Sequence, residues 1–132
     1  MVFFERFSYG RYGFILKDKG FDIALFVINA HEELVNKGLD YKMSQRFLHF
    51  GTNIKVWIDD ADKVPYDEII KDPAEFLNSL SNARKCALET KKVIKSLHET
   101  KFIDNELNKK LTKLIDYILE LLAEIIDKGR YE

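Results

Sequence analysis

The chain has 132 residues, of which 46% are apolar and 33% are charged, a composition that suits one folded domain rather than a disordered segment. Its 21 basic and 22 acidic residues leave a formal net charge of −1, which excludes a globally basic nucleic-acid binder. The longest apolar run covers only residues 23–28, far short of the roughly 18 residues that a membrane-spanning helix needs. We therefore expect a domain that does not enter a membrane.

Location follows from two further features of the sequence. The charges of Glu5 and Arg6 interrupt the apolar stretch that a secretory signal would need. The single cysteine, Cys86, cannot form an internal disulfide, which agrees with a reducing compartment. We expect a cytoplasmic protein.

The first twenty residues differ from the rest of the chain, because glycine and aromatic residues are concentrated there. The stretch 8–13 contains Ser, Tyr and two glycines, which is typical of a turn. We expect residues 1–20 to form an irregular aromatic arm or a small hairpin, and residues 21–132 to form the folded bundle.

Helical spacing begins at about Phe21, where apolar residues recur at steps of three and four. Gly38 is expected to end this first helix. A second helix is expected from about Tyr41 until shortly before Pro65. The residues that carry the spacing are Ala24, Val27, Ile28, His31, Leu34 and Val35 in the first helix, and Phe47, Phe50, Ile54, Ile58 and Ala61 in the second.

The segment 59–75 contains seven acidic residues and two prolines, so we expect a solvated connection. At its end Asp72 is expected to cap a third helix, with Pro73 in the first turn and Glu75 closing a capping box. This helix is expected to reach about Thr100 and to bury one face. The residues of that face are Phe76, Leu80, Ala83, Ala87 and Ile94.

A fourth helix is expected to begin after Asp104 as its cap. Its apolar residues form a heptad seam, at Leu107, Leu111, Leu114, Ile118, Leu121 and Ile125. A second row, Ile115, Leu119, Leu122 and Ile126, lies beside the seam, so that the apolar arc is about 160° wide at 100° per residue. Four amphipathic helices with short connections predict an all-α fold, an antiparallel up-and-down four-helix bundle.

The width of this arc also predicts self-association. A bundle core needs an arc of about 100° or more, so the fourth helix has apolar surface left for another chain. Exposed aromatic side chains in the arm are costly unless something covers them. We therefore expect a homo-oligomer whose interface contains Phe3, Phe4, Phe7, Leu119 and Leu122.

No pattern indicates catalysis, a metal site or a cofactor. His31 opens a sequence similar to a zinc-protease helix, but Val35 stands where the second histidine would be needed. The acidic run 59–62 lacks the glycine and the distal glutamate of a calcium loop. Cys86 has no neighbouring histidine or second cysteine in the sequence, so a structural thiol is the simpler interpretation.

Basic residues are concentrated on one side of the third helix. From residue 84 to residue 113 there are nine basic and four acidic residues, and clustered cations on a rigid helix suit phosphate binding. The candidate nucleic-acid-binding residues fall within about 120° of one another at 100° per residue, and they are Arg84, Lys85, Lys91, Lys92 and Lys95. The alternative is a solvated face that the acidic segment 59–75 neutralises.

Two segments resemble a known family. Residues 45–54, QRFLHFGTNI, followed by IDDA at 58–61, resemble Q-L-x-R-S-G-T-S-I-G-A-N-I-x-E-A, a segment of the four-helix-bundle proteins encoded by intervening sequences in bacterial 23S rRNA genes. Residues 72–90 resemble the third helix of that family. This chain differs from the family at several polar positions, and these are His49, Trp57, Asp60 and Cys86.

The resemblance implies a fold similar to the accessory variability determinant proteins of diversity-generating retroelements. Those proteins form oligomeric barrels with basic surfaces and associate with RNA and reverse transcriptase. The resemblance therefore implies a non-enzymatic scaffold that engages RNA or a nucleic-acid-bound protein. The alternative is a protein–protein interaction module without nucleic-acid binding.

Overall fold

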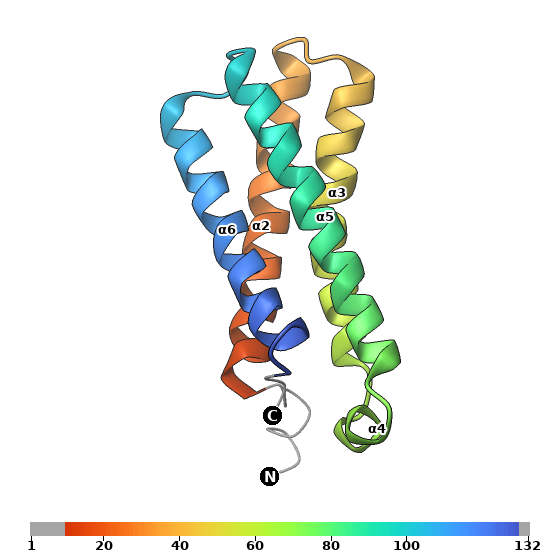
Figure 1. The fold of residues 1–132 in the computed structure, drawn as a ribbon. Coiled ribbons are helices and arrows are strands. Elements are labelled where there is room, and N and C mark those ends of the chain that lie inside the picture. The colour runs from red at the N-terminus through yellow and green to blue at the C-terminus, as the bar shows by residue number, and fades with distance from the viewer. Residues whose placement is uncertain (1–9, 130–132) are drawn as a thin grey trace.

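The computed structural model describes residues 10–129, with only the backbone of residues 10 and 11. Four long helices lie side by side, and a short one connects the second and third of them at one end of the bundle (Figure 1). The long helices are α2 (Gly10–Asn36), α3 (Tyr41–Asp62), α5 (Ala74–Glu99) and α6 (Asn105–Ile126), and the short one is α4 (Tyr66–Lys71). Residues 10–129 contain no strand, and the all-α bundle expected from the sequence is confirmed.

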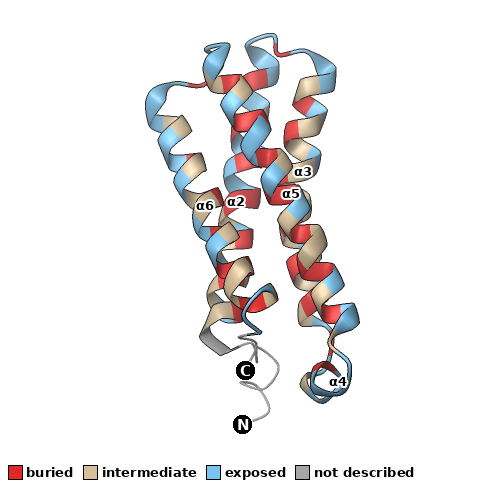
Figure 2. Cartoon of the chain, viewed as in Figure 1, coloured by how far each residue is buried: buried red, intermediate tan, exposed pale blue. Residues whose placement is uncertain are grey.

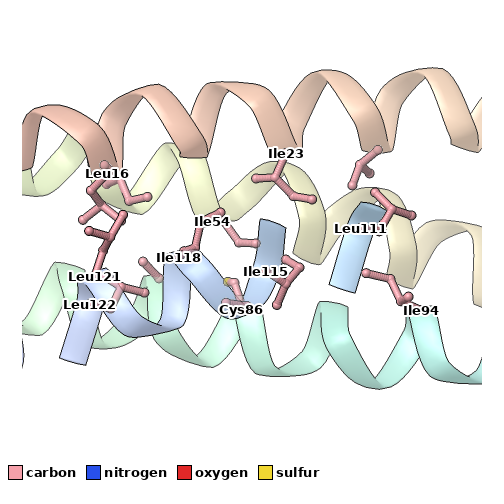
Figure 3. Close-up of a cluster of buried hydrophobic side chains, with 14 of the residues drawn as sticks. Leu16, Ile23, Ile54, Cys86, Ile94, Leu111, Ile115, Ile118, Leu121 and Leu122 are labelled. Carbon is pink, nitrogen blue, oxygen red and sulfur yellow. The ribbon is translucent and has the colours of Figure 1, made fainter. Parts of the chain in front are cut away.

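Each long helix packs against two others around one core. α2 contacts α3 and α6, and α5 also contacts α3 and α6. The residues expected to form the core face of α5 are all buried, as are most of the expected residues of α3 (Figure 2). Figure 3 shows side chains from all four long helices meeting in this core, among them Leu16, Ile54, Ile94 and Ile118.

The first helix begins earlier than the sequence predicted. The expected irregular arm is wrong for residues 10–20, which are helical. Local glycine and turn propensity is outweighed by tertiary packing, because Leu16 is fully buried and continues the core-facing spacing that leads to Ile23 and Val27. Residues 1–9, and with them Phe3, Phe4 and Phe7, lie outside the described residues.

The end of α2 confirms the role expected for Gly38. Gly38 has φ +89°, and its N–H donates to the carbonyl of Val35 at 3.0 Å. The N–H of Leu39 donates to the carbonyl of Leu34 at 3.0 Å. These two bonds form a Schellman motif, in which glycine takes the left-handed conformation without steric cost.

Asp104 caps α6 as predicted, whereas the N-cap residue of α5 is Pro73, which has no side-chain cap, and not the predicted Asp72. Asp104 accepts from the N–H of Leu107 at 2.8 Å at the start of α6. Asp72 accepts from the N–H of Ala74 at 3.1 Å, and α5 begins at Ala74, one residue later than the predicted Pro73. Aspartate at these places satisfies amide groups that have no partner within the helix.

The acidic segment 59–75 is more ordered than a solvated connection. α3 continues through its first residues to Asp62, and α4 occupies Tyr66–Lys71. Ile69 of α4 is fully buried, whereas its neighbour Ile70 is exposed. The short helix therefore closes one end of the core with a single apolar side chain.

The wide apolar arc of α6 is used inside the protomer. Leu122 is fully buried, and Leu119 is half-buried and packs against the core. The arc is filled because α6 lies between α2 and α5 and contacts both. Placing Leu122 in an oligomer interface was therefore wrong, since a second chain cannot reach it without unfolding α6.

In the described part of the chain, no helix combines the length and the apolar character needed to cross a membrane.

Candidate nucleic-acid interface and association surface

The five basic residues predicted to bind nucleic acid lie on the outward side of α5. The opposite side of this helix is buried against α3 and α6, so the helical spacing turns the basic residues away from the core. Arg84 is partly exposed, and the other four, Lys85, Lys91, Lys92 and Lys95, are exposed. Their charges, however, are not equally available.

Two of these cations pair with carboxylates of α6. Arg84 Nη2 lies 2.9 Å from Asp127 Oδ1, and Lys91 Nζ lies 2.6 Å from Asp116 Oδ1. Exposed ion pairs of this kind contribute between about 0 and 1 kcal/mol to stability. In both pairs a carboxylate already neutralises the cation, so that cation is less available to a phosphate.

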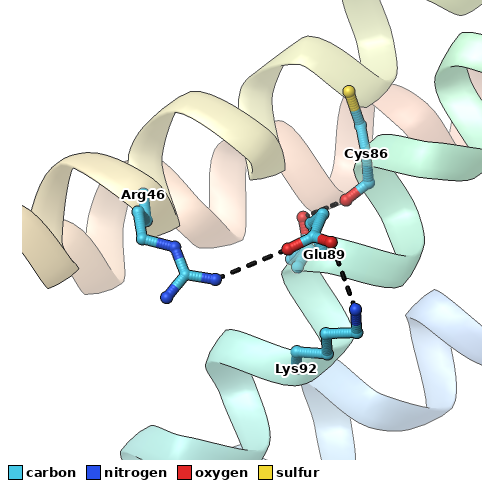
Figure 4. Close-up of polar contacts among 5 residues, drawn as sticks. Arg46, Cys86, Glu89 and Lys92 are labelled. Atoms are coloured by element: carbon cyan, nitrogen blue, oxygen red, sulfur yellow. Dashed lines mark hydrogen bonds and ion pairs between the residues drawn. The ribbon is translucent and has the colours of Figure 1, made fainter.

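Glu89 lies between two cations from different helices (Figure 4). Lys92 Nζ lies 3.2 Å from Glu89 Oε1, and Arg46 Nη2 of α3 lies 3.4 Å from Glu89 Oε2. The group of three residues carries a net charge of +1, because one carboxylate faces two cations. Glu89 thus partly neutralises the charge of Lys92 on the side of α5 that faces α3.

The remaining two basic residues, Lys85 and Lys95, are exposed and form no ion pair within residues 10–129. Their ammonium groups are free to neutralise a phosphate without first releasing a carboxylate. Of the five predicted residues, these two are the best suited to phosphate contact.

Two lysines of α6, which were not among the predicted site residues, extend this basic surface. The contacts Lys91–Asp116 and His98 Nε2–Asn105 Oδ1, at 2.6 Å each, set the antiparallel register of α5 and α6. Lys95 lies between these contacts along α5, and exposed residues Lys109 and Lys113 lie between them along α6. We call these three the lysine cluster: Lys95, Lys109 and Lys113.

No ion pair of Lys109 or Lys113 exists among the described side chains. The two residues are four apart, so they occupy adjacent turns of one helix surface. Their spacing was a visible signal in the sequence. Both residues belong to the basic segment 84–113, but the predicted site was confined to the third helix.

The acidic residues at the end of α3 hold helices together. Asp62 Oδ2 lies 2.8 Å from Lys17 Nζ of α2, and Asp60 Oδ2 accepts from the buried Ser79 hydroxyl of α5 at 2.9 Å. Asp59 pairs with a lysine one turn earlier in α3. Within residues 10–129 no group of three or more His, Cys, Asp or Glu side chains is arranged to hold a metal ion.

Cys86 lies in the core of the bundle (Figure 3). Burial raises the pKa of the Cys86 thiol, because removal from water disfavours the thiolate. A protonated, buried thiol is a poor nucleophile. The carbonyl of Cys86 accepts from the Thr90 hydroxyl at 2.7 Å, which fixes the buried Thr90 within the same helix (Figure 4).

A second surface feature lies on α2. Five large apolar side chains form one row along its outer side, and each is between 45% and 54% exposed. We call this row the α2 stripe: Phe14, Phe21, Leu25, Ile28 and Val35. With Asp18 and Glu32 included, the row follows a strict 4-3 spacing from residue 14 to residue 35, the spacing of a coiled-coil seam.

The α2 stripe was not predicted from the sequence, for two reasons. The helix was expected to begin at residue 21, which cut the row, and Ile28 and Val35 were expected to share one face with Ala24 and Val27. In the structure Ala24 and Val27 are buried, whereas Ile28 and Val35 are half exposed. α2 therefore carries two apolar faces, one in the core and one on the surface.

These features define a helical-bundle protein whose distinctive surfaces are a basic edge and an apolar stripe. No family model matches the sequence, and a search of curated proteins finds no match. Among solved structures, the chain is similar to a protein of unknown function from the S23 ribosomal protein family of Bacteroides thetaiotaomicron. The TM-score is 0.76 and the sequence identity is 31%, over 84% of this chain and 97% of the other.

At this identity and coverage, the chain belongs to the S23 ribosomal protein family. The resemblance found in residues 45–61 and 72–90 is thus confirmed at the level of a family named for a ribosomal protein. An origin in an intervening sequence of a 23S rRNA gene stays a prediction.

Proposed function

We propose that this protein is a non-enzymatic, cytoplasmic scaffold that self-associates and engages RNA, or a partner bound to RNA. The observation that carries the proposal is the lysine cluster at the α5–α6 edge, where three ammonium groups lie without ion pairs in the described structure. The family's name, and the resemblance to proteins encoded in 23S rRNA intervening sequences, support RNA as the nucleic acid.

The physical argument rests on local rather than total charge. A chain with a net charge of −1 gains nothing from long-range attraction to RNA, so binding depends on the cations that directly contact phosphates. Each contact releases counterions from the nucleic acid, which makes the affinity fall as the salt concentration rises. One protomer offers only four such cations without ion pairs, which is a small number of phosphate contacts for one binding site. They are Lys85, Lys95, Lys109 and Lys113. Self-association supports the proposal because it would place several such sites along one RNA.

A non-enzymatic role is supported by the chemistry of the groups that are present. The buried Cys86 thiol has a raised pKa, and the acidic residues at the end of α3 pair with Lys17, Ser79 and a lysine of α3 itself. Cys86 and these carboxylates thus contribute to the packing of the bundle, and none of them has the surroundings of an activated nucleophile or an acid catalyst.

The proposal is tested by comparing two variants that lose the same charge. The cluster variant carries Gln at three positions, Lys95→Gln, Lys109→Gln and Lys113→Gln. The control variant carries Lys42→Gln, Lys63→Gln and Lys71→Gln, three exposed lysines on α3, at its C-terminal end and on α4. Fluorescence anisotropy with hairpin and single-stranded RNA oligonucleotides, at about 50 mM salt, measures the affinity.

We expect the cluster variant to lose about tenfold or more in affinity and the control variant to lose much less, because phosphate contacts are local. Equal losses would show that only the total charge matters and would contradict the assignment of the lysine cluster. Absence of salt-sensitive RNA binding by the wild-type protein would favour the alternative, a protein–protein interaction module. The α2 stripe is the observation that favours that alternative.

A further inference from the structure

Two members of the lysine cluster line an open groove on the outer side of α6. The groove has a volume of about 540 Å³, and Lys109, Lys113 and Tyr117 are among the α6 residues that line it. These three residues are four positions apart in turn, so they follow one row of the helix surface, with steps of about 6 Å at 1.5 Å per residue. Two cations that form no ion pair in the described structure are thus followed by one aromatic ring.

Tyr117 is placed where its ring can contact a ligand in the groove. The residue is 38% exposed. Lys19 of α2 lies over the ring, with its Nζ atom 6.0 Å from the ring centroid, and Lys19 does not line the groove. A cation is attracted to the face of an aromatic ring, so this contact helps to hold the ring in place. One side of Tyr117 thus meets α2, and another borders the groove.

We infer that this groove binds an unpaired nucleotide of RNA, whose base stacks on Tyr117 while the neighbouring phosphates contact Lys109 and Lys113. Proteins that bind single strands combine cations that follow the backbone with aromatic rings on which the bases stack. Every base has an aromatic face, so such a site needs no particular sequence. The inference rests on the proposed function, because the same lysines carry both, and it adds which kind of RNA they bind.

The carboxylates in the groove restrict where the phosphates can lie. Asp116 is paired with a lysine of α5, so its charge is balanced. Glu120 is exposed and forms no ion pair among the described side chains, so it repels phosphate from the part of the groove beyond Tyr117. Lys109 and Lys113 attract phosphate to the other part. The charge therefore changes sign along the groove near Tyr117, which leaves the ring to an uncharged base.

A duplex fits this arrangement less well than a single strand. In an RNA duplex each base is paired and stacked between its neighbours, so no base face is open to Tyr117. A duplex can still contact Lys109 and Lys113, and phosphate contacts alone would favour it, because its charge density is higher. We therefore expect the wild type to bind a single strand more tightly than a duplex of the same length, and this preference should depend on Tyr117.

The first test changes the ring and measures RNA affinity by fluorescence anisotropy. Tyr117→Ala should lower the affinity for a single-stranded oligonucleotide at least about fivefold, the effect of losing one stacked base, and should leave the affinity for a duplex unchanged. Tyr117→Phe keeps the ring and should bind like the wild type. Tyr41→Ala is the matched control, since Tyr41 is 78% exposed on α3, whose main contacts are with α2 and α5. Circular dichroism checks that each variant is folded.

The second test removes the bases instead of the ring. A fully abasic oligonucleotide keeps every phosphate but has nothing to stack on Tyr117. The wild type should bind it about as weakly as Tyr117→Ala binds the normal oligonucleotide, and Tyr117→Ala should bind both equally, because the two changes remove the same contact. The slope of log affinity against log salt should be the same for wild type and Tyr117→Ala, since the phosphate contacts that set the slope are intact.

The outcomes separate this inference from the proposed function. RNA binding that is weakened in the variant without the lysine cluster, but is unchanged by Tyr117→Ala or by removal of the bases, would overturn stacking in the groove and retain the lysine cluster. Absence of salt-sensitive RNA binding by the wild type would overturn both. Weaker binding of the single strand by Tyr117→Ala, with an unchanged salt slope and no further loss for the abasic oligonucleotide, is the result that the inference predicts.

Discussion

Gly51 of α3 lies so close to Val27 of α2 that a Cβ atom at Gly51 would come within 2.6 Å of Val27 Cγ2. Both residues are buried, and Val27 approaches with its Cβ and both methyl groups. Glycine inside a helix normally costs about 1 kcal/mol relative to alanine, so its presence here reflects the close contact of the two helices. Gly51 is also the glycine of the segment that resembles the family.

Gly51→Ala should therefore destabilise the bundle, although alanine is the better helix former. Overpacking of a buried contact costs about 1–3 kcal/mol, which exceeds the gain of about 1 kcal/mol in helix propensity. We expect a net loss of about 1–2 kcal/mol in the free energy of unfolding, measured in urea.

A double-mutant cycle tests the cause. In a Val27→Ala background the two methyl groups are absent, so the same Gly51→Ala change should cost little or should stabilise. An equal loss in both backgrounds would mean that the contact with Val27 is not the reason for the glycine.

Lys101 offers a stabilising substitution. It follows α5 with φ +66°, a left-handed conformation that costs a residue with a Cβ about 1–2 kcal/mol. The N–H of Phe102 donates to the carbonyl of Leu97 at 2.9 Å, so the turn repeats the motif that Gly38 forms after α2. Lys101→Gly should raise the free energy of unfolding by about 0.5–1 kcal/mol. Lys101→Ala is the control and should give no such gain, because it removes the charge but keeps the Cβ.

Leu122 tests the corrected position of the α6 residues. Leu122→Ala should lower the free energy of unfolding by about 2–5 kcal/mol, the usual cost of a cavity in a core. Leu119→Ala should cost less, since Leu119 is only half-buried. Neither change should alter the mass measured for the wild type under native conditions, and a Leu122→Ala protein as stable as the wild type would contradict the burial of Leu122.

Much of this fold followed from sequence patterns, because the patterns and the packing agree. The 4-3 spacing of α6, the face of α5 and the cap Asp104 are local signals that tertiary structure did not override. The start of α2 was misjudged since glycines and aromatics gave a turn signal, whereas burial of Leu16 decides the helix. Which of two apolar faces of α2 enters the core is set by α3 and α6, and periodicity within one helix cannot show that.

The candidate site followed from the sequence only in part. Spacing placed the basic residues on one side of α5, and the structure agrees in exposing them. Spacing could not show that Arg84 and Lys91 meet carboxylates of α6, since those partners are more than twenty residues away in the sequence. For the same reason, helical spacing could not predict that Lys95 and Lys109 lie at the same level of the bundle, because this depends on the register between α5 and α6.

Cys86 leads to a prediction about pH. Its thiol has a raised pKa in the folded protein, so the folded state holds its proton more tightly than the unfolded chain. The stability linked to this group is fully present below the ordinary thiol pKa of about 8.5, and it is lost as the pH rises above that value. The difference in unfolding free energy between wild type and Cys86→Ala should be constant from pH 6 to about 8 and should shrink toward pH 10. A constant difference up to pH 10 would contradict a buried, protonated thiol.

The central claim is that the lysine cluster at the α5–α6 edge contacts RNA phosphates, and one measurement tests it most directly. RNA affinity is measured by anisotropy between about 50 and 200 mM salt for wild type and for the variant with Lys95→Gln, Lys109→Gln and Lys113→Gln. Each phosphate contact to single-stranded RNA adds about 0.7 to the slope of log affinity against log salt. The wild type should bind with a steep slope, and the variant should bind more weakly with a shallower slope, because three phosphate contacts are removed. Wild-type protein that binds no RNA at about 50 mM salt, or a variant with the same affinity and slope as the wild type, would contradict the claim.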